Sequence, residues 1–330
     1  MGTRVELHLF GSDDRAALLA ARRAIEAVDD ALTIHRPSAT TALNECLMAG
    51  RPCRIDDPVL LDALVEIEAA YPATYGLFDP AADVSRPGAG WNMISFGRDN
   101  AGIEASRPVA LDFGGFGKGF ALDRACATLR AAGVASAFLC AGESSIAVVG
   151  EHPLGGGWPV AIPHPLEPGR FLAEFELRDE ALSISSTVGA GTAAPERAAM
   201  IRPTDTSVVT APRTTVAIDR SGARAEAMST ALIVADDDQA GYLLDCGRAC
   251  SPPQSSPARG RWHAQRDGGG GSTSIAGRRP PPPSVPVFAE TDTSPWRGRI
   301  EGRSAVTRRF LFDFSREAAM PVQPGEMALQ

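Results

Sequence analysis

A glycine-rich turn between a predicted strand and a predicted helix constrains this chain more than any other feature. The strand is predicted over residues 109–112, and apolar residues spaced for a helix follow the turn as far as Gly133. Glycines let a backbone approach a ligand closely, and a helix N-terminus offers free N–H groups and the positive end of its dipole. Lys118, the only lysine among the 32 basic residues, lies inside the turn and adds a mobile cation. The segment therefore suits a phosphate or pyrophosphate, although its spacing is neither that of a P-loop nor that of a dinucleotide fingerprint, and a plain tight turn stays an alternative.

The rest of the first 247 residues predicts an α+β fold in which mixed sheets pack against helices. Alternating apolar residues predict a strand from Val5 to Leu9, and further strands are predicted over 134–149, 158–162 and 214–218. Helices are predicted to begin after Asp14 and after Asp57, with a third over 225–234. The elements alternate irregularly, which favours α+β over a doubly wound sheet.

Composition divides the chain into residues 1–247 and 248–330. The last 80 residues hold 11 of the 26 prolines, runs of glycine and proline, and an excess of arginine over acidic residues. This composition predicts a disordered tail that is dispensable for ligand binding, and it also resembles GC-rich DNA read in the wrong frame. One patch, residues 310–314, is apolar enough to dock on the folded part.

Charge and cysteine content narrow the class of protein. A net charge of −8 argues against a nucleic-acid-binding protein, and no run of about 18 apolar residues predicts a membrane span. No apolar signal core follows the start, so a cytoplasmic location is expected. The six cysteines form no CxxC pair and are expected to be free thiols in a reducing compartment.

Six segments stand in a recognisable order along roughly residues 1–245. They are MGT at 1–3, a serine at 38 leading to LN at 43–44, GLFDP at 76–80, LDFGGFGKGFALD at 111–123, a run with GV at 133–134, AGE at 141–143 and WPVAI at 158–162, and AEAMSTAL at 225–232. Together they resemble FAD:protein FMN transferases of the ApbE family, and the strongest match is the glycine-rich segment, which is similar to the family's LDLGAIAKGYAVD signature.

The resemblance implies transfer of FMN from FAD to a threonine or serine hydroxyl of an acceptor flavoprotein, with Mg²⁺ as cofactor and AMP released. Lys118 and Glu226 are the implied catalytic residues. The implied FAD contacts are Met1, His35, Leu77, Phe78, Asp79, Asp112, Lys118 and Met200. The implied metal site is the Gly115 carbonyl with Glu226, Ser229 and Thr230. The last three stand at i, i+3 and i+4, so they are expected on one helix face.

The chain also departs from the family pattern. Residues 199–206 read AMIRPTDT where the family has HIIDPRTG, residues 185–187 read SST for TSG, and Glu226 replaces an aspartate. His35 stands where the family commonly has tyrosine. Binding of FAD and Mg²⁺ is therefore predicted more firmly than turnover. An FAD pyrophosphatase that forms FMN and AMP, and a non-catalytic flavin-binding module, are the alternatives.

Overall fold

A six-stranded antiparallel sheet organises the molecule. The computed structural model describes residues 3–188, 200–245 and 308–313. Neighbouring strands follow the order β1-β5-β6-β9-β10-β11. Their bounds are β1 Val5–Leu9, β5 Ala137–Ala141, β6 Ser145–Val149, β9 Ala181–Ser186, β10 Arg213–Asp219 and β11 Arg308–Asp313. Two smaller sheets pair β2 (Cys53–Arg54), β4 (Gly102–Ala105) and β3 (Ile94–Gly97), and β7 (Trp158–Pro163) with β8 (Phe171–Leu177). The predicted α+β class with mixed sheets and packed helices is confirmed.

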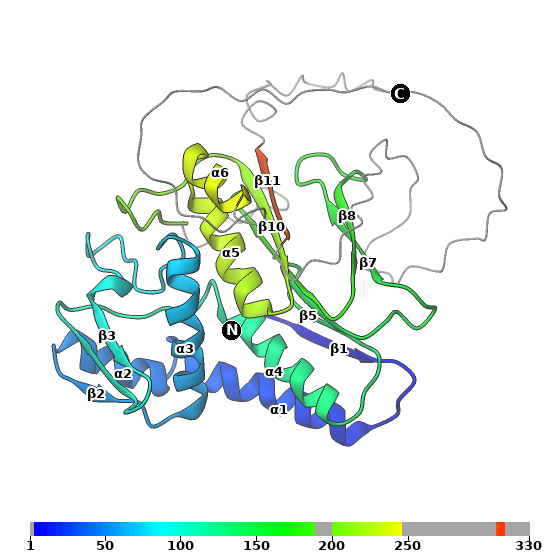
Figure 1. Ribbon diagram of the computed structural model, residues 1–330, viewed down its shortest axis with the longest axis horizontal. Coiled ribbons are helices and arrows are strands. Elements are labelled where there is room, and N and C mark those ends of the chain that lie inside the picture. The colour runs from blue at the N-terminus through cyan, green and yellow to red at the C-terminus, as the bar shows by residue number, and fades with distance from the viewer. Residues whose placement is uncertain (1–2, 189–199, 246–307, 314–330) are drawn as a thin grey trace, which may run out of the picture.

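Helices cover one face of the large sheet and the β7–β8 hairpin covers the other (Figure 1). The helices are α1 (Arg15–Leu32), α2 (Ala39–Met48), α3 (Pro58–Ala73), α4 (Gly117–Ala131), α5 (Gly222–Val234) and α6 (Asp237–Asp245), with a 3-10 turn at Trp91–Met93. A large core lies between the helices and the sheet, and a second core around Trp158 lies beneath the hairpin. This three-layer arrangement places the N-termini of α4 and α5 at one end of the sheet.

Local signals predicted the helix starts correctly. The Asp14 carboxylate accepts hydrogen bonds from the backbone amides of Ala16 and Ala17 at the start of α1. Asp57 accepts one from the amide of Leu60, with Pro58 in the first turn of α3. Both are N-caps that satisfy amides with no partner inside the helix.

The strand predicted over 109–112 is wrong. Two hydrogen bonds join Leu111 to the side chain of Asn44 on α2: the Leu111 amide donates to Oδ1 at 2.7 Å, and Nδ2 donates to the Leu111 carbonyl at 2.9 Å. The next amide, of Asp112, donates to the carbonyl of Pro80 at 2.8 Å. A side-chain amide thus takes the place that a neighbouring strand would fill, which periodicity alone does not reveal.

The predicted tail from residue 248 onward joins the fold at Arg308–Asp313, which overlaps the patch at 310–314 that the sequence marked as apolar enough to dock. These residues form β11, which pairs antiparallel with β10 and closes one edge of the large sheet. Phe310 packs against Phe175 with ring centroids 4.9 Å apart. Burial of this apolar patch supplies the stabilisation that the composition of its surroundings lacks. The other residues of 248–330, and with them the prediction of a disordered tail, lie outside the described residues.

Cysteine pairing corrects a second expectation. Cys46 at the end of α2 and Cys53 in β2 form a disulfide with their Cα atoms 6.4 Å apart. Two cysteines brought this close by the fold can bridge, although their separation in sequence matches no redox motif. Cys126 and Cys140 are free thiols, as predicted, and burial raises the pKa of Cys126 to about 12. Cys246 and Cys250 lie outside the described residues. No helix in the described part of the chain is long and apolar enough to cross a membrane.

Candidate active site at the crossing of α4 and α5

The crossing of α4 and α5 is so close that it requires glycine on both helices. A Cβ atom on Gly119 would lie 2.1 Å from the carbonyl oxygen of Gly222, and a Cβ on Gly222 would lie 2.7 Å from the carbonyl oxygen of Gly119. Neither contact is possible for any other residue without a shift of the helix backbones. Sequence reasoning assigned Gly119 to phosphate binding, whereas the structure assigns it to helix packing.

Asp123 fixes this crossing from the α4 side. Its carboxylate accepts hydrogen bonds from the Ser221 hydroxyl at 2.8 Å and from the amides of Gly222 at 2.6 Å and Ala223 at 3.0 Å. Burial raises the pKa of Asp123, and these three donors oppose that rise. Asp123 therefore caps the neighbouring helix α5.

The crossing brings Lys118 and Glu226 together. Lys118 Nζ lies 3.0 Å from Glu226 Oε1, and the Ser145 hydroxyl donates to the same oxygen at 2.5 Å. The Glu226 side chain is 3% exposed and that of Lys118 22%. Glu226 Oε2 is buried and has no hydrogen-bond partner among the described residues. A buried carboxylate oxygen without a partner is costly and points to a missing cation or donor.

Gly115 and Thr230 meet one helical turn beyond Glu226. The Thr230 hydroxyl donates to the Gly115 carbonyl at 3.5 Å, and a Cβ on Gly115 would lie 3.2 Å from that hydroxyl oxygen and 3.8 Å from the Phe78 ring. The glycine therefore keeps space open between the turn and α5. This carbonyl, this hydroxyl and Glu226 were predicted to share a site; the structure brings the carbonyl and the hydroxyl together, one turn of α5 away from Glu226.

The Ser229 hydroxyl makes its contacts elsewhere, and its role as a metal ligand stays a prediction. Its side chain is fully buried against β9, where the hydroxyl lies 3.0 Å from the hydroxyls of both Ser183 and Ser185. It also donates to the Glu226 carbonyl at 3.1 Å. Glu226 and Ser229 are spaced i, i+3 on α5 as predicted, but strand β9 covers the helix surface at Ser229.

The residues present fit a hard divalent cation. Mg²⁺ takes oxygen ligands and keeps several waters, so one carboxylate oxygen, one hydroxyl and one carbonyl can be the protein's share. No group of three or more His, Cys, Asp or Glu side chains that could hold a metal exists in the described ranges. The oxygen atoms of Glu226, Thr230 and the Gly115 carbonyl are of the kind that such an ion binds.

The implied FAD contacts near the glycine-rich turn are mostly buried. Leu77 is 2% exposed and Phe78 is 3% exposed, and the Phe78 ring stacks on Phe116 with centroids 6.2 Å apart. The Asp79 carboxylate accepts from the amides of Ala81 and Trp91, while burial raises its pKa. Of these residues Phe78 lies next to Gly115, 3.8 Å from its Cβ position, and the roles of all three in FAD binding stay predictions.

Four other implied contacts remain, and one of them lies outside the described ranges. Asp112 is exposed and its side chain accepts from the Gly114 amide at 2.8 Å, so it closes the turn locally. His35 is exposed between α1 and α2. Met200 packs against the large core. Met1 lies outside the described residues.

The turn at 200–209, which lacks the family's side chains at their positions, is closed by backbone hydrogen bonds. The Arg202 carbonyl accepts a hydrogen bond from the Thr206 amide at 2.8 Å, and Ile201 and Val208 form an antiparallel β-bridge. Thr206 stands where the family has glycine and adopts φ +58°. The Arg202 guanidinium donates to the Val234 carbonyl at the end of α5 at 2.8 Å. The arginine at the family's aspartate position thus serves packing, while a β-branched residue adopts a strained backbone conformation.

The profile of the ApbE family matches residues 1–250, three quarters of the chain. The chain belongs to the ApbE family. It is similar in fold to the flavin transferase ApbE from Vibrio cholerae (TM-score 0.63, 18% identity, 75% of this chain and 88% of that chain). It also resembles the Pseudomonas stutzeri flavinyl transferase ApbE in its apo form (TM-score 0.60, 20% identity, 73% and 87%). No curated protein sequence matches it.

An ApbE protein from Thermotoga maritima is comparably similar (TM-score 0.61, 18% identity, 74% of this chain and 88% of that chain). At these identities the likeness establishes the fold alone. Sequence reasoning missed two positioning residues in this fold, Asn44 and Ser145. Both lie in or beside matched segments, and their contacts became visible only once distant elements were packed together.

Proposed function

We propose that this ApbE-family chain transfers FMN from FAD to a threonine or serine hydroxyl of an acceptor flavoprotein, with release of AMP. The observation that carries the proposal is the buried Glu226, which shares one oxygen between Lys118 and Ser145, while no described residue forms a hydrogen bond with its other oxygen. A cytoplasmic acceptor stays a prediction from the sequence.

Glu226 Oε2, the Thr230 hydroxyl and the Gly115 carbonyl would hold Mg²⁺. The ion, when bound, neutralises negative charge on the pyrophosphate and makes its phosphorus easier to attack. Ser145 and Lys118 hold Glu226 in place from its other oxygen. Asn44 supports the turn from behind through its two hydrogen bonds to Leu111.

Lys118 is the residue proposed to contact the pyrophosphate. It lies in the first turn of α4, where free backbone N–H groups also favour an anion. The acceptor hydroxyl oxygen forms a bond to the FMN phosphorus, the bond from that phosphorus to the AMP oxygen breaks, and the hydroxyl proton is released. Lys118 and the helix N-terminus stabilise charge that moves onto AMP.

The test follows AMP in a mixture of the protein, FAD and Mg²⁺, with and without an acceptor flavoprotein. AMP that appears only with the acceptor, together with covalent flavin on that acceptor, supports the proposal. AMP released equally without acceptor identifies a pyrophosphatase, and FAD binding without AMP identifies a flavin-binding module. Glu226→Gln in the same mixture controls for contaminating hydrolases.

A further inference from the structure

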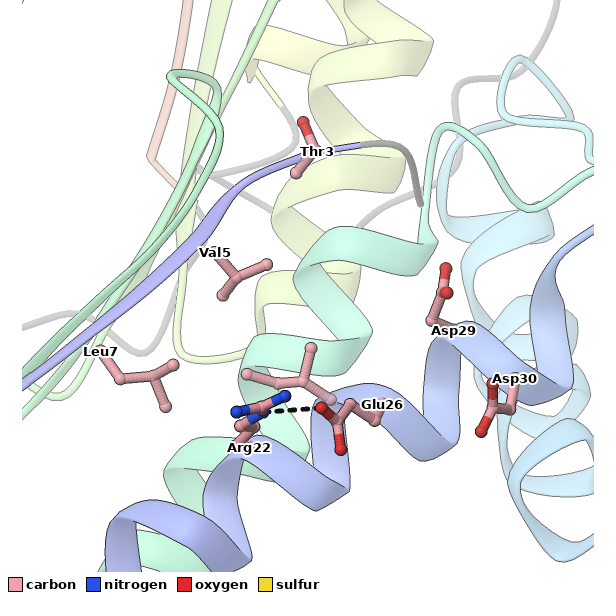
Figure 2. Close-up of a pocket in the computed structure, with 8 residues that line it drawn as sticks. Thr3, Val5, Leu7, Arg22, Glu26, Asp29 and Asp30 are labelled. Carbon is pink, nitrogen blue, oxygen red and sulfur yellow. Dashed lines mark hydrogen bonds and ion pairs between the residues drawn. The ribbon is translucent and has the colours of Figure 1, made fainter.

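An open groove runs between the edge strand β1 and helix α1 (Figure 2). It encloses about 730 Å³ and is lined by Val5 and Leu7 of β1 and by Ile25, Glu26, Asp29 and Asp30 of α1. β1 is one of the two edges of the large sheet within the described residues. An exposed edge strand is where an extended peptide can add a strand to a sheet, and here α1 forms the opposite wall of the groove.

The backbone of β1 is oriented to accept another strand. The Arg4 carbonyl accepts from the Gly142 amide at 2.8 Å, and the Phe10 amide donates to the Ser136 carbonyl at 3.0 Å. In the antiparallel register Val5↔Ala141 to Leu9↔Ala137, even-numbered residues of β1 therefore bond to β5. The amides and carbonyls of Val5, Leu7 and Leu9 point away from the sheet, and no partner for them is found in the described part of the chain.

The groove leads towards the candidate active site. Thr3 lines the end away from Leu7 (Figure 2), and its hydroxyl oxygen lies 3.0 Å from where a Cβ of Gly142 would be. Gly142 belongs to the turn between β5 and β6, and this turn ends at Ser145, which holds Glu226. A strand added to β1 therefore ends near the residues proposed to bind the pyrophosphate.

The charged side chains of α1 indicate which side chains the added strand would present to the groove. Three carboxylates, of Glu26, Asp29 and Asp30, face two guanidiniums: Arg22 lies 2.7 Å from Glu26, and Arg36 lies 2.9 Å from Asp29 and 2.7 Å from Asp30. The whole chain carries a net charge of −8, which attracts a basic segment. A second copy of β1 would bring the same carboxylates together, which opposes self-pairing.

We propose that the β1–α1 groove binds an extended segment of the acceptor protein by strand addition, with apolar side chains against Val5 and Leu7 and a lysine or arginine towards α1. This inference rests on the proposed function, because the bound segment would be the part of the acceptor that presents the threonine or serine hydroxyl for FMN transfer. Backbone hydrogen bonds to β1 can form with any extended segment, whereas contacts with the groove depend on the side chains of that segment.

The test measures amide hydrogen exchange of the full chain by NMR. The probe is a seven-residue peptide of alternating valine and threonine with a lysine at each end. In the free protein the amides of Val5, Leu7 and Leu9 exchange quickly, while those of Glu6 and His8 are protected. Saturating peptide slows exchange at Val5 and Leu7 about tenfold or more, and the fully N-methylated peptide leaves it unchanged.

Variants of the groove make the test specific. Leu7→Pro removes an outward N–H but no bond to β5, so it weakens peptide binding about fivefold more than Leu7→Ala, which keeps that N–H. Asp30→Lys weakens the lysine peptide about threefold at low salt, and Glu174→Lys on exposed β8 does not. Should Leu7→Pro fail to fold, the N-methylated peptide still decides.

Three results overturn the inference. Slow exchange at Val5 and Leu7 at every protein concentration without peptide means that another part of this chain covers the edge. Protection that rises with protein concentration identifies a second copy as the occupant. Peptide binding that leaves these amides unchanged places the peptide elsewhere. Calorimetry of FAD on the same samples tests the proposed function separately, because FAD binding does not require the groove.

Discussion

The α4–α5 crossing and the turn at 200–209 differ in which features of the family pattern they carry. The α4–α5 side carries the side chains proposed to function, with Lys118 3.0 Å from Glu226, a glutamate in place of the family's aspartate, and Thr230 on the Gly115 carbonyl. The 200–209 turn keeps a backbone bridge between Ile201 and Val208 but none of the family's polar residues at their positions. Phosphate and metal chemistry needs specific donor atoms, whereas a turn needs only a backbone path. One side is therefore proposed to do chemistry and the other to support the fold.

The largest expected effect comes from Gly119→Ala, which tests whether the α4–α5 side depends on the helix crossing. The added Cβ would meet the Gly222 carbonyl oxygen at 2.1 Å, so the two helices must separate. We expect a loss of about 3 kcal/mol in the free energy of unfolding, measured by urea denaturation. Gly241→Ala on α6 is the matched control, since nothing lies within 4 Å of its Cβ position. An unchanged urea midpoint for Gly119→Ala would show that the crossing tolerates a wider spacing.

Glu226→Gln tests whether the negative charge of Glu226 on the α4–α5 side is needed for Mg²⁺. The change keeps the shape of the side chain and removes the charge from the oxygen that lacks a partner. We expect the Mg²⁺ needed for half-maximal FAD turnover, or for FAD binding if there is no turnover, to rise about tenfold or more. Glu176→Gln on β8 is the control. The same Mg²⁺ titration in wild type and Glu226→Gln would place the ion elsewhere.

Lys118→Ala tests the cation of the α4–α5 side. We expect FAD binding to weaken by about 1–3 kcal/mol, the size of a charge-assisted hydrogen bond. Calorimetry measures this at a temperature where both proteins are folded, because truncation also leaves Glu226 without its ion pair. Arg124→Ala removes a cation from the same helix, where Arg124 pairs with Asp62, and is expected to leave FAD affinity unchanged. Equal FAD affinity in wild type and Lys118→Ala would exclude Lys118 from the site.

The smallest effect is expected on the other side, from Thr206→Gly. Glycine relieves the strain of φ +58° but adds backbone freedom to the unfolded chain, so the net gain in stability is about 0.5–1 kcal/mol. Ala101→Gly, at φ +51° in the β3–β4 turn, provides the same backbone comparison away from the site. FAD affinity should not change in either variant. A change of FAD affinity in Thr206→Gly alone would show that this turn takes part in binding.

The sequence by itself determined much of the local structure. Asp14 and Asp57 identified helix starts because an N-cap is a contact within one turn, and the alternation of Val5, Leu7 and Leu9 identified a half-buried strand. The glycine-rich turn, with Lys118 and the helix after it, was recognised from composition and spacing. Each of these signals is contained in a few consecutive residues.

Only the tertiary structure decided which distant groups meet. Asn44 replaces a strand partner for Leu111, Asp123 caps a helix that begins 99 residues later in the chain, and the Ser229 hydroxyl lies against β9. Cys46 pairs with Cys53, and Arg308–Asp313 completes a sheet that the surrounding composition did not predict. Helical spacing specifies a face but not what covers it, because coverage depends on how sheets and helices pack.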